Sequence, residues 1–166
     1  MLTDLVEIRR LGEKKREENL RFRRHLKTHG LNERRFRRIA EEIEEQIDCT
    51  VCANCCKVAT ARLAKRDVER LARHLRVKPR VLLRDYSETS GEEGLVLRST
   101  TAGCVFLDGT ACTVYDERPA SCQDFPHLVR GAGSLVSRMW EMPDRACYCP
   151  IVYNALEAYK VEAAFR

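Results

Sequence analysis

Four cysteines fall within eight residues of this chain, and no other feature restricts its fold as strongly. The stretch is Cys49-Thr-Val-Cys52-Ala-Asn-Cys55-Cys56, in which two C-x-x-C pairs are joined. A C-x-x-C pair lets two thiols converge on one ion, and thiolates are soft ligands for zinc, copper(I) and iron–sulfur clusters. Five more cysteines follow in the chain: Cys104, Cys112, Cys122, Cys147 and Cys149.

The cysteine spacing fits two kinds of metal centre. Zinc sites combine a C-x-x-C pair with a second, distant pair. Ferredoxin-type clusters, 4Fe-4S clusters among them, use C-x-x-C-x-x-C with a remote Cys-Pro. Cys49, Cys52 and Cys55 have this second spacing, and Cys149-Pro150 supplies a Cys-Pro far downstream. The pattern therefore predicts zinc or iron as the cofactor, with an iron–sulfur cluster as one form of the iron.

Disulfide bonds and buried, unligated thiols are the two alternative interpretations of these cysteines. The count of nine is odd, and residues 1–15 are charged with no apolar signal-peptide core. We therefore expect a cytoplasmic protein whose thiols stay reduced. One or two cysteines can serve as small buried hydrophobes. The density at residues 49–56 argues against that role for all nine.

The length of 166 residues predicts one metal-binding domain with an appended arm. We place the arm, a charged helical hairpin, at residues 1–48 and the cysteine cluster domain at residues 49–166. With 33% charged residues the core is modest, so bound metal would supply folding free energy on the order of 10 kcal/mol. No run of about 18 apolar residues occurs, so we expect no membrane partner.

Charge is unevenly distributed along the arm. Residues 9–38 contain thirteen Lys or Arg and four Glu, whereas residues 39–48 contain five acids and no base. A basic helix face can bind nucleic acid through its phosphates or a protein partner. It can equally be a solvated face, and only Phe22 and Phe36 are available there for base stacking.

Apolar periodicity predicts mainly helices. We expect helices at residues 3–28, 33–47, 64–77, 80–86 and 151–165, the last two opened by Pro79 and Pro150. Residues 87–94 are predicted to be a polar loop. Short strands are expected at 95–97, 104–107 and 112–115, with a hairpin turn at Asp108-Gly109 that places Cys104 opposite Cys112. The predicted fold class is α+β, mostly helical with a small antiparallel sheet and a cysteine-rich metal site.

A second motif accompanies the first cluster. It reads Cys104-Val-Phe-Leu, followed by Cys112-Thr-Val-Tyr-Asp-Glu-Arg-Pro-Ala-Ser-Cys122-Gln-Asp-Phe-Pro. Together the two motifs resemble the YkgJ-type cysteine cluster family, a zinc- or iron-chelating domain named after CxxCxxCC, over about residues 49–126. The resemblance implies metal or cluster binding, and family members are often loosely called iron–sulfur oxidoreductases. Gln123 departs from the family, which usually has Arg after this cysteine.

Nine thiols exceed the needs of one tetrahedral site. We predict a principal metal site that uses Cys49, Cys52 and either Cys55 or Cys56. Further cysteines would complete this site or form a second one: Cys104, Cys112, Cys122, Cys147 and Cys149. Cys55 and Cys56 are neighbours, so we expect their side chains to diverge and to serve different sites, or one of them to support the other. Arg118 is expected either to be a structural salt-bridge partner or to lower the pKa of a nearby thiol, because positive charge favours thiolate.

Three functions fit these observations. The chain can be a metal-binding protein with structural zinc, or it can hold an iron–sulfur cluster and exchange electrons with a redox partner. Alternatively, it is an interaction module in which zinc supports the fold and the basic helices bind nucleic acid or protein. We find no H-E-x-x-H motif and no phosphate-binding glycine loop, so redox chemistry is the enzyme class left open.

Overall fold

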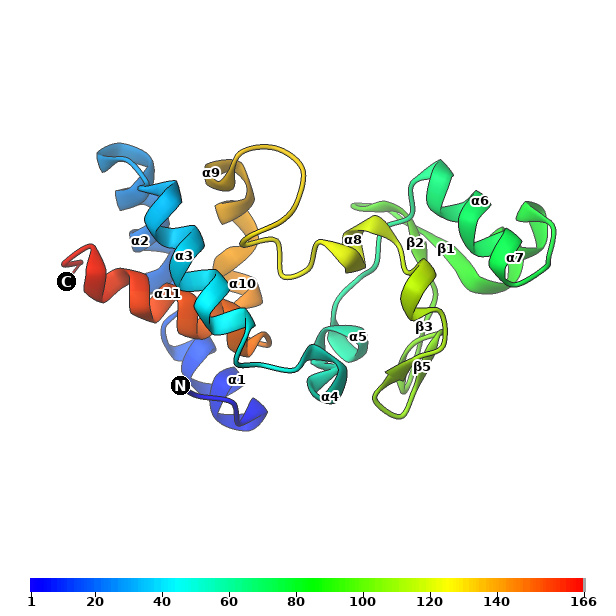
Figure 1. Ribbon diagram of the computed structural model, residues 1–166, viewed down its shortest axis with the longest axis horizontal. Coiled ribbons are helices and arrows are strands. Elements are labelled where there is room, and N and C mark those ends of the chain that lie inside the picture. Colours follow the sequence, from blue (N-terminus) through cyan, green and yellow to red (C-terminus); the bar gives the residue numbers. More distant parts are fainter. Residues whose placement is uncertain (166) are drawn as a thin grey trace. The chain divides into compact units, whose positions relative to one another are not determined.

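A computed structural model of the chain describes residues 1–165, which form two compact units (Figure 1). We call Met1–Asp48 together with the chain from Phe125 onward the helical unit, and Cys49–Asp124 the cysteine unit. Seven of the nine cysteines belong to the cysteine unit, and Cys147 and Cys149 belong to the helical unit. Helices predominate, and the described strands form three two-stranded antiparallel sheets, so the predicted α+β class is confirmed.

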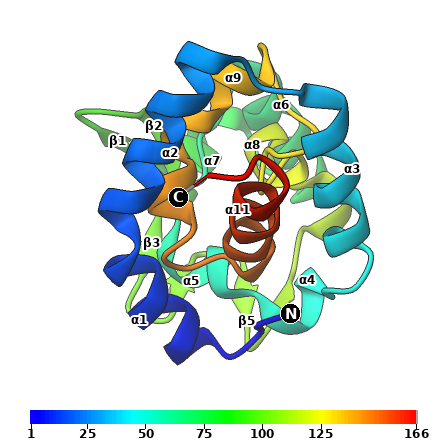
Figure 2. The same ribbon diagram turned by 90° about the vertical axis from the view of Figure 1, so that its left-hand side faces the viewer.

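The helical unit is built around its last helix. Its elements are α1 (Leu5–Lys14), α2 (Arg16–His29), α3 (Glu33–Glu44), α9 (Leu135–Arg138), η2 (Met139–Glu141), α10 (Met142–Arg145) and α11 (Pro150–Glu162). Figure 2 looks along α11 and shows α2 and α3 on opposite sides of it. Pro150 opens α11, as predicted, because its ring presets the helical φ and needs no N–H donor there.

Aromatic rings fill the centre of the helical unit. Phe22 and Phe36 are fully buried, and each packs on Tyr159 of α11, with ring centroids 6.0 and 5.1 Å away. Tyr159 also accepts a hydrogen bond through its hydroxyl from the Asn32 N–H, 3.0 Å away, at the start of α3. The core therefore ties the helical hairpin of residues 1–48 to the C-terminal helix.

A buried ion pair joins α2 to α11. Lys160 is only 5% exposed, and its ammonium lies 2.6 Å from carboxylate oxygens of both Glu18 and Glu157. Glu157 also pairs with Lys15. Two cations and two carboxylates thus neutralise one another where a single buried charge would be costly.

The prediction of one helix over residues 3–28 was wrong. The chain leaves helical geometry at Lys15, where φ is −93° and ψ is 6°, and this residue separates α1 from α2. Nearby, Gly12 lies so close to the backbone of Ala146 that a Cβ atom would be 2.5 Å from its carbonyl oxygen. Contacts of this kind come from the tertiary fold, which apolar periodicity does not reveal.

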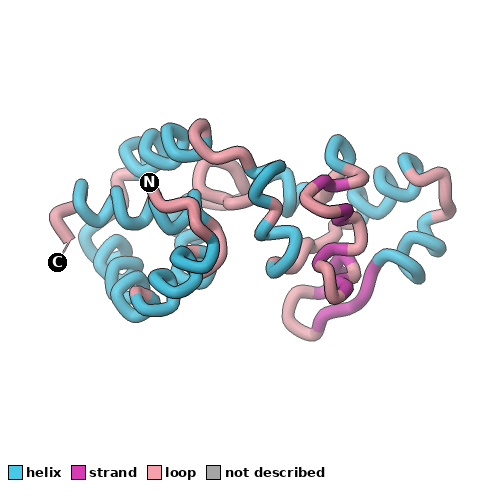
Figure 3. Tube along the Cα trace, turned by 90° about the horizontal axis from the view of Figure 1, so that it is seen from below, coloured by secondary structure: helices cyan, strands magenta, loops and turns pink. Residues whose placement is uncertain are grey.

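The cysteine unit contains short elements. They are α4 (Cys49–Cys52), α5 (Asn54–Val58), α6 (Lys65–His74), α7 (Pro79–Tyr86), β1 (Ser87–Ser90), β2 (Gly94–Leu97), β3 (Ser99–Thr100), β4 (Gly103–Cys104), β5 (Leu107–Asp108), β6 (Ala111–Cys112), η1 (Tyr115–Glu117) and α8 (Ala120–Gln123). All the strands in Figure 3 belong to this unit. No helix in residues 1–165 is long and apolar enough to cross a bilayer.

Two predictions about the strands were wrong. Residues 87–90 form β1, which pairs with β2 in the register Ser87↔Leu97, and are not part of a polar loop. Cys104 does not face Cys112: it pairs with Ser99, while Cys112 pairs with Leu107. The reason is the two-residue turn between Asp108 and Ala111, which brings Leu107 opposite Cys112.

An apolar core lies beneath these hairpins. Leu71 and Leu82 are fully buried, and the rings of Tyr86 and Phe106 stack 5.2 Å apart. Partly buried residues around this core include Cys104 and Cys112. The hairpins are thereby held by packing in the cysteine unit, and their cysteines lie at the edge of its core.

Candidate metal centre

The first cysteine motif forms two single helical turns joined by a strained residue. Cys49 and Cys52 lie in α4, and Cys55 and Cys56 lie in α5. Between them Ala53 is 3% exposed and has a φ of 45°, in the left-handed region that residues with a Cβ rarely adopt. This sharp change of direction lets two C-x-x-C turns follow each other without merging into one helix.

Gly103 allows the first motif to lie against the second. Its φ is 119°, and a Cβ at this position would lie 2.7 Å from the Cys56 carbonyl oxygen and 2.9 Å from the Lys57 Cα. Only glycine fits so close to another backbone in this conformation. Gly103 immediately precedes Cys104, so this contact brings β4 and its cysteine against α5.

Four thiols from separate segments come together at this place: Cys56, Cys104, Cys112 and Cys122. Every pair among them interacts electrostatically. Such interactions fall with distance, so sulfur atoms from α5, β4, β6 and α8 share one neighbourhood. Cys55 adjoins this group, because its thiol is hydrogen-bonded to that of Cys56.

Burial and charge separate the four thiols by acidity. A hydrogen bond with Cys55, with help from the positive charge of Arg118, lowers the pKa of Cys56 to about 7. Burial raises the pKa of Cys122 to about 12 and also raises the pKa of Cys104 and of Cys112. Cys56 therefore carries much of the thiolate character at neutral pH. The expected effect of Arg118 on a nearby thiol is confirmed.

A buried carboxylate fixes the segment that bears Arg118 and Cys122. Asp67 is 1% exposed and accepts hydrogen bonds from the N–H groups of Ala64 (2.9 Å) and Ala120 (3.3 Å). Arg70 donates through the same Nη2 to Asp67 (3.0 Å) and to the Arg118 carbonyl (2.7 Å). The start of α6 is thus connected by charge-assisted hydrogen bonds to the residues on either side of Pro119.

Two further contacts hold this segment. Gln123, which stands where the resembling family usually has Arg, donates through Nε2 to the Arg118 carbonyl at 2.8 Å. Ser121 donates through its hydroxyl to the Arg62 carbonyl at 2.9 Å. The residue before Cys122 and the residue after it are therefore both anchored, which limits where the Cys122 sulfur can lie.

The expectation that the neighbouring side chains of Cys55 and Cys56 diverge was wrong, since their thiols are hydrogen-bonded. Cys49 and Cys52 belong to α4, which lies against β6. Their role as ligands stays a prediction.

Cys147 and Cys149 lie in the helical unit. The Cys147 thiol donates to the Pro143 carbonyl at 3.5 Å, and burial raises its pKa. Cys149 is buried in the apolar core with Ala146 and Ile151. Their role as ligands also stays a prediction.

The donor set of the cysteine unit fits a thiophilic metal. Four sulfur donors are the number that a tetrahedral zinc or iron site uses, and a buried thiolate needs a cation nearby. Within residues 1–165, however, no three His, Cys, Asp or Glu side chains are already arranged as a ligand set. Binding would therefore require the thiols to move closer together than they are in this structure.

One family model matches residues 48–150, more than half of the chain: CxxCxxCC, described as a "putative zinc- or iron-chelating domain". The chain belongs to this family. The CxxCxxCC match begins one residue before Cys49 and ends one residue after Cys149, so it includes all nine cysteines. No curated protein and no solved structure matches the chain.

Sequence reasoning missed the residues that support the CxxCxxCC motifs. The sequence contains a weak signal for Asp67. It lies three residues after Ala64, the residue before α6, and an acidic side chain at that spacing can accept from the backbone N–H of the residue that caps the helix. Gly103 gave none, because nothing in the sequence shows which backbone it approaches. Arg70 looked like one of many solvated arginines.

Proposed function

We propose that the cysteine unit binds a transition-metal ion through the thiolates of Cys56, Cys104, Cys112 and Cys122. The observation that carries this proposal is the close approach of Gly103, next to Cys104, to the backbone of Cys56 and Lys57, which brings β4 against α5. The four thiols, which come from four separate elements, also affect one another's pKa values. Membership of the CxxCxxCC family supports it, because that family is described as zinc- or iron-chelating. Cys55, hydrogen-bonded to Cys56, orients its neighbour and holds it in the thiolate form.

Arg118 has a defined role in this proposal. Four thiolates around a divalent ion leave a net charge of about −2, which a nearby cation stabilises. The guanidinium of Arg118 acts electrostatically on Cys56 and Cys112, and it is held 3.9 Å above the Tyr115 ring by a cation–π contact. A bound zinc ion would supply only cross-linking of these segments, whereas iron would add one-electron redox chemistry.

Elemental analysis after anaerobic purification tests metal binding. The wild-type chain is expected to contain zinc or iron, and Cys112→Ser is expected to lose most of it and several kcal/mol of stability. Cys147→Ser is the comparison, because its thiol belongs to the helical unit. Equal metal content and equal melting temperatures in wild type and Cys112→Ser would refute the proposal.

Electron transfer by an iron–sulfur cluster is the second candidate. It is favoured by the C-x-x-C-x-x-C spacing of Cys49, Cys52 and Cys55, which ferredoxin-type clusters use. A cluster would absorb visible light near about 400 nm and lose that absorption on reduction with dithionite. A colourless protein with stoichiometric zinc would exclude this candidate and leave metal binding intact.

A further inference from the structure

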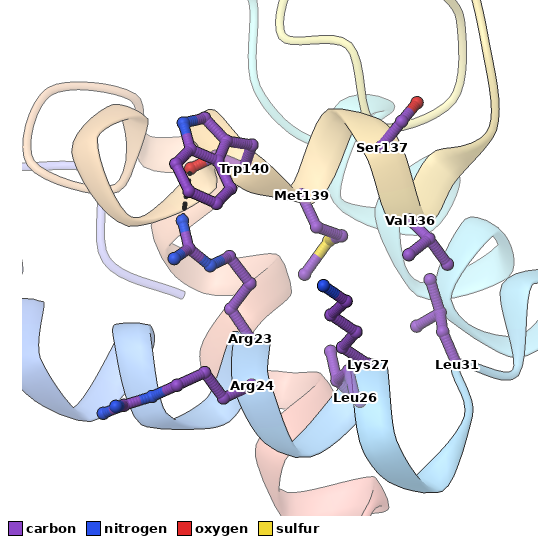
Figure 4. A pocket seen from close by; sticks show the side chains of 9 residues that line it. All are labelled: Arg23, Arg24, Leu26, Lys27, Leu31, Val136, Ser137, Met139 and Trp140. Carbon is purple, nitrogen blue, oxygen red and sulfur yellow. Dashed lines mark hydrogen bonds between the residues drawn. The ribbon is translucent and has the colours of Figure 1, made fainter.

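The helical unit contains a cavity of about 320 Å³ between α2 and the segment formed by α9 and η2. Apolar side chains make most of its lining: Leu26, Leu31, Val136, Met139 and Trp140. Figure 4 shows Leu31 opposite Val136, and Met139 pointing from the η2 side towards α2. The size is at the lower end of the range for ligand pockets and suits one or two large apolar side chains.

Three cations border this apolar cavity on one side. All three come from α2 and lie within five consecutive residues: Arg23, Arg24 and Lys27. No carboxylate is among the residues that line the cavity. Within residues 1–165, none of these three has a salt bridge, although Arg16, Arg35 and Lys160 of the same unit each pair with an acid. The rim is therefore a concentration of positive charge that no carboxylate among residues 1–165 neutralises through a salt bridge.

Trp140 is exposed to an unusual degree for so large an apolar residue, at 70%. It is nevertheless held in place, because the Arg23 guanidinium lies 4.0 Å from the ring centroid and donates to the Trp140 carbonyl at 3.1 Å. Tryptophan and arginine in such an arrangement are typical of the residues that dominate protein–protein interfaces. Because Arg23 already covers one face of the ring, that face is closed to a stacking nucleobase.

We propose that this cavity is a docking site for an acidic segment of a partner protein. The partner inserts an apolar side chain, of the size of leucine or phenylalanine, between Leu31, Val136 and Met139. Its carboxylates pair with Arg24 and Lys27 at the rim. The charge complementarity selects an acidic partner, and the apolar lining selects a peptide side chain over a phosphate backbone. This function is separate from metal binding, because every residue that forms the cavity belongs to the helical unit.

The experiment uses the full chain and the fluorescence of Trp140, which is the single tryptophan. The probe is a short acetylated and amidated peptide of glutamate, leucine and phenylalanine. Binding is expected to change the intensity and the emission maximum, and added salt is expected to weaken it because the rim charges are exposed. Arg24→Glu/Lys27→Glu is expected to bind about tenfold more weakly or worse.

Two variants separate the cavity from general charge. Arg34→Glu/Arg37→Glu makes the same change of net charge on exposed positions of α3 that do not line the cavity, and it should bind within about twofold of wild type. Val136→Asp places a carboxylate at the cavity wall on a side chain that is 43% exposed, so the fold tolerates it, and it should abolish binding. Circular dichroism confirms that each variant is folded.

Several results would overturn the proposal. One is an unchanged Trp140 spectrum with the acidic peptide, and another is equal binding of a peptide in which lysine replaces glutamate. Tighter binding of a single-stranded oligonucleotide, lost in Arg24→Glu/Lys27→Glu, would make the surface a nucleic-acid site. A spectrum that changes with protein concentration alone would show that a second copy of the chain occupies the cavity.

Discussion

Replacing Asp67 by alanine is expected to destabilise the cysteine unit strongly. The carboxylate is 1% exposed and accepts from two backbone N–H groups and from Arg70. Its removal leaves the N–H groups of Ala64 and Ala120 without this acceptor, whereas Arg70 keeps the Arg118 carbonyl and Glu117 as partners. A hydrogen bond to a charged acceptor contributes about 1.5–3 kcal/mol, so losing the two from Ala64 and Ala120 costs about 3–5 kcal/mol.

Amide hydrogen exchange in α6 measures this loss locally, which matters because the two units need not unfold together. A loss of about 3–5 kcal/mol corresponds to exchange that is at least about a hundredfold faster. Glu69→Ala is the matched control, since it removes an exposed carboxylate from the same helix. Equal protection of the α6 amides in Asp67→Ala and Glu69→Ala would refute the reasoning, and so would unchanged metal content in Asp67→Ala.

Three other predictions concern the metal site and the buried ion pair. Gly103→Ala is expected to reduce the amount of bound metal, measured by elemental analysis, because the added Cβ forces β4 away from Cys56. Gly91 has open space around it, so Gly91→Ala should keep the wild-type metal content. Equal losses of metal in the two variants would contradict this prediction. Zinc binding near neutral pH is expected to release about three to four protons, because Cys104, Cys112 and Cys122 have raised pKa values and Cys56 titrates near 7. The affinity for zinc should therefore fall as pH falls. Calorimetry in buffers of different ionisation enthalpy measures how many protons are released per zinc ion bound. Release of at most about one proton would exclude this ligand set. Lys160 lowers the pKa of Glu18 below its ordinary 4.5, so the stability that this pair provides is present above that value and is lost as pH falls through the lower folded pKa. Lys160→Met should lose this acid dependence when unfolding is followed by Trp140 fluorescence, and acid midpoints that match wild type would disprove it.

The helices were largely predictable because their signals are local. Pro79 and Pro150 begin α7 and α11, and the apolar spacing of residues 33–47 corresponds to α3. The break at Lys15 was not predictable, since no glycine or proline marks it in the sequence. The close packing of Gly12 against Ala146 was not predictable either, because the two residues are more than a hundred positions apart. Local propensity is overridden where tertiary contacts are this close.

The candidate metal centre was predictable in its residue types and only partly in its arrangement. Density and spacing of cysteine indicated the chemistry, and the family match confirms the CxxCxxCC assignment. The error in pairing Cys104 with Cys112 was avoidable, because a two-residue turn at Gly109 and Thr110 places Leu107 opposite Cys112. By contrast, the support from Asp67 and Gly103 depends on backbone groups distant in sequence, which spacing cannot reveal.

The division of the chain has a consequence for its synthesis. The cysteine unit is one continuous stretch, whereas the helical unit needs α11, whose residues leave the ribosome after those of the cysteine unit. Nascent chains fold in order of emergence, so the thiols can capture their ion while the N-terminal helices still lack their central partner. Metal supply during translation, and not only in the finished protein, would then determine how much of the chain matures correctly.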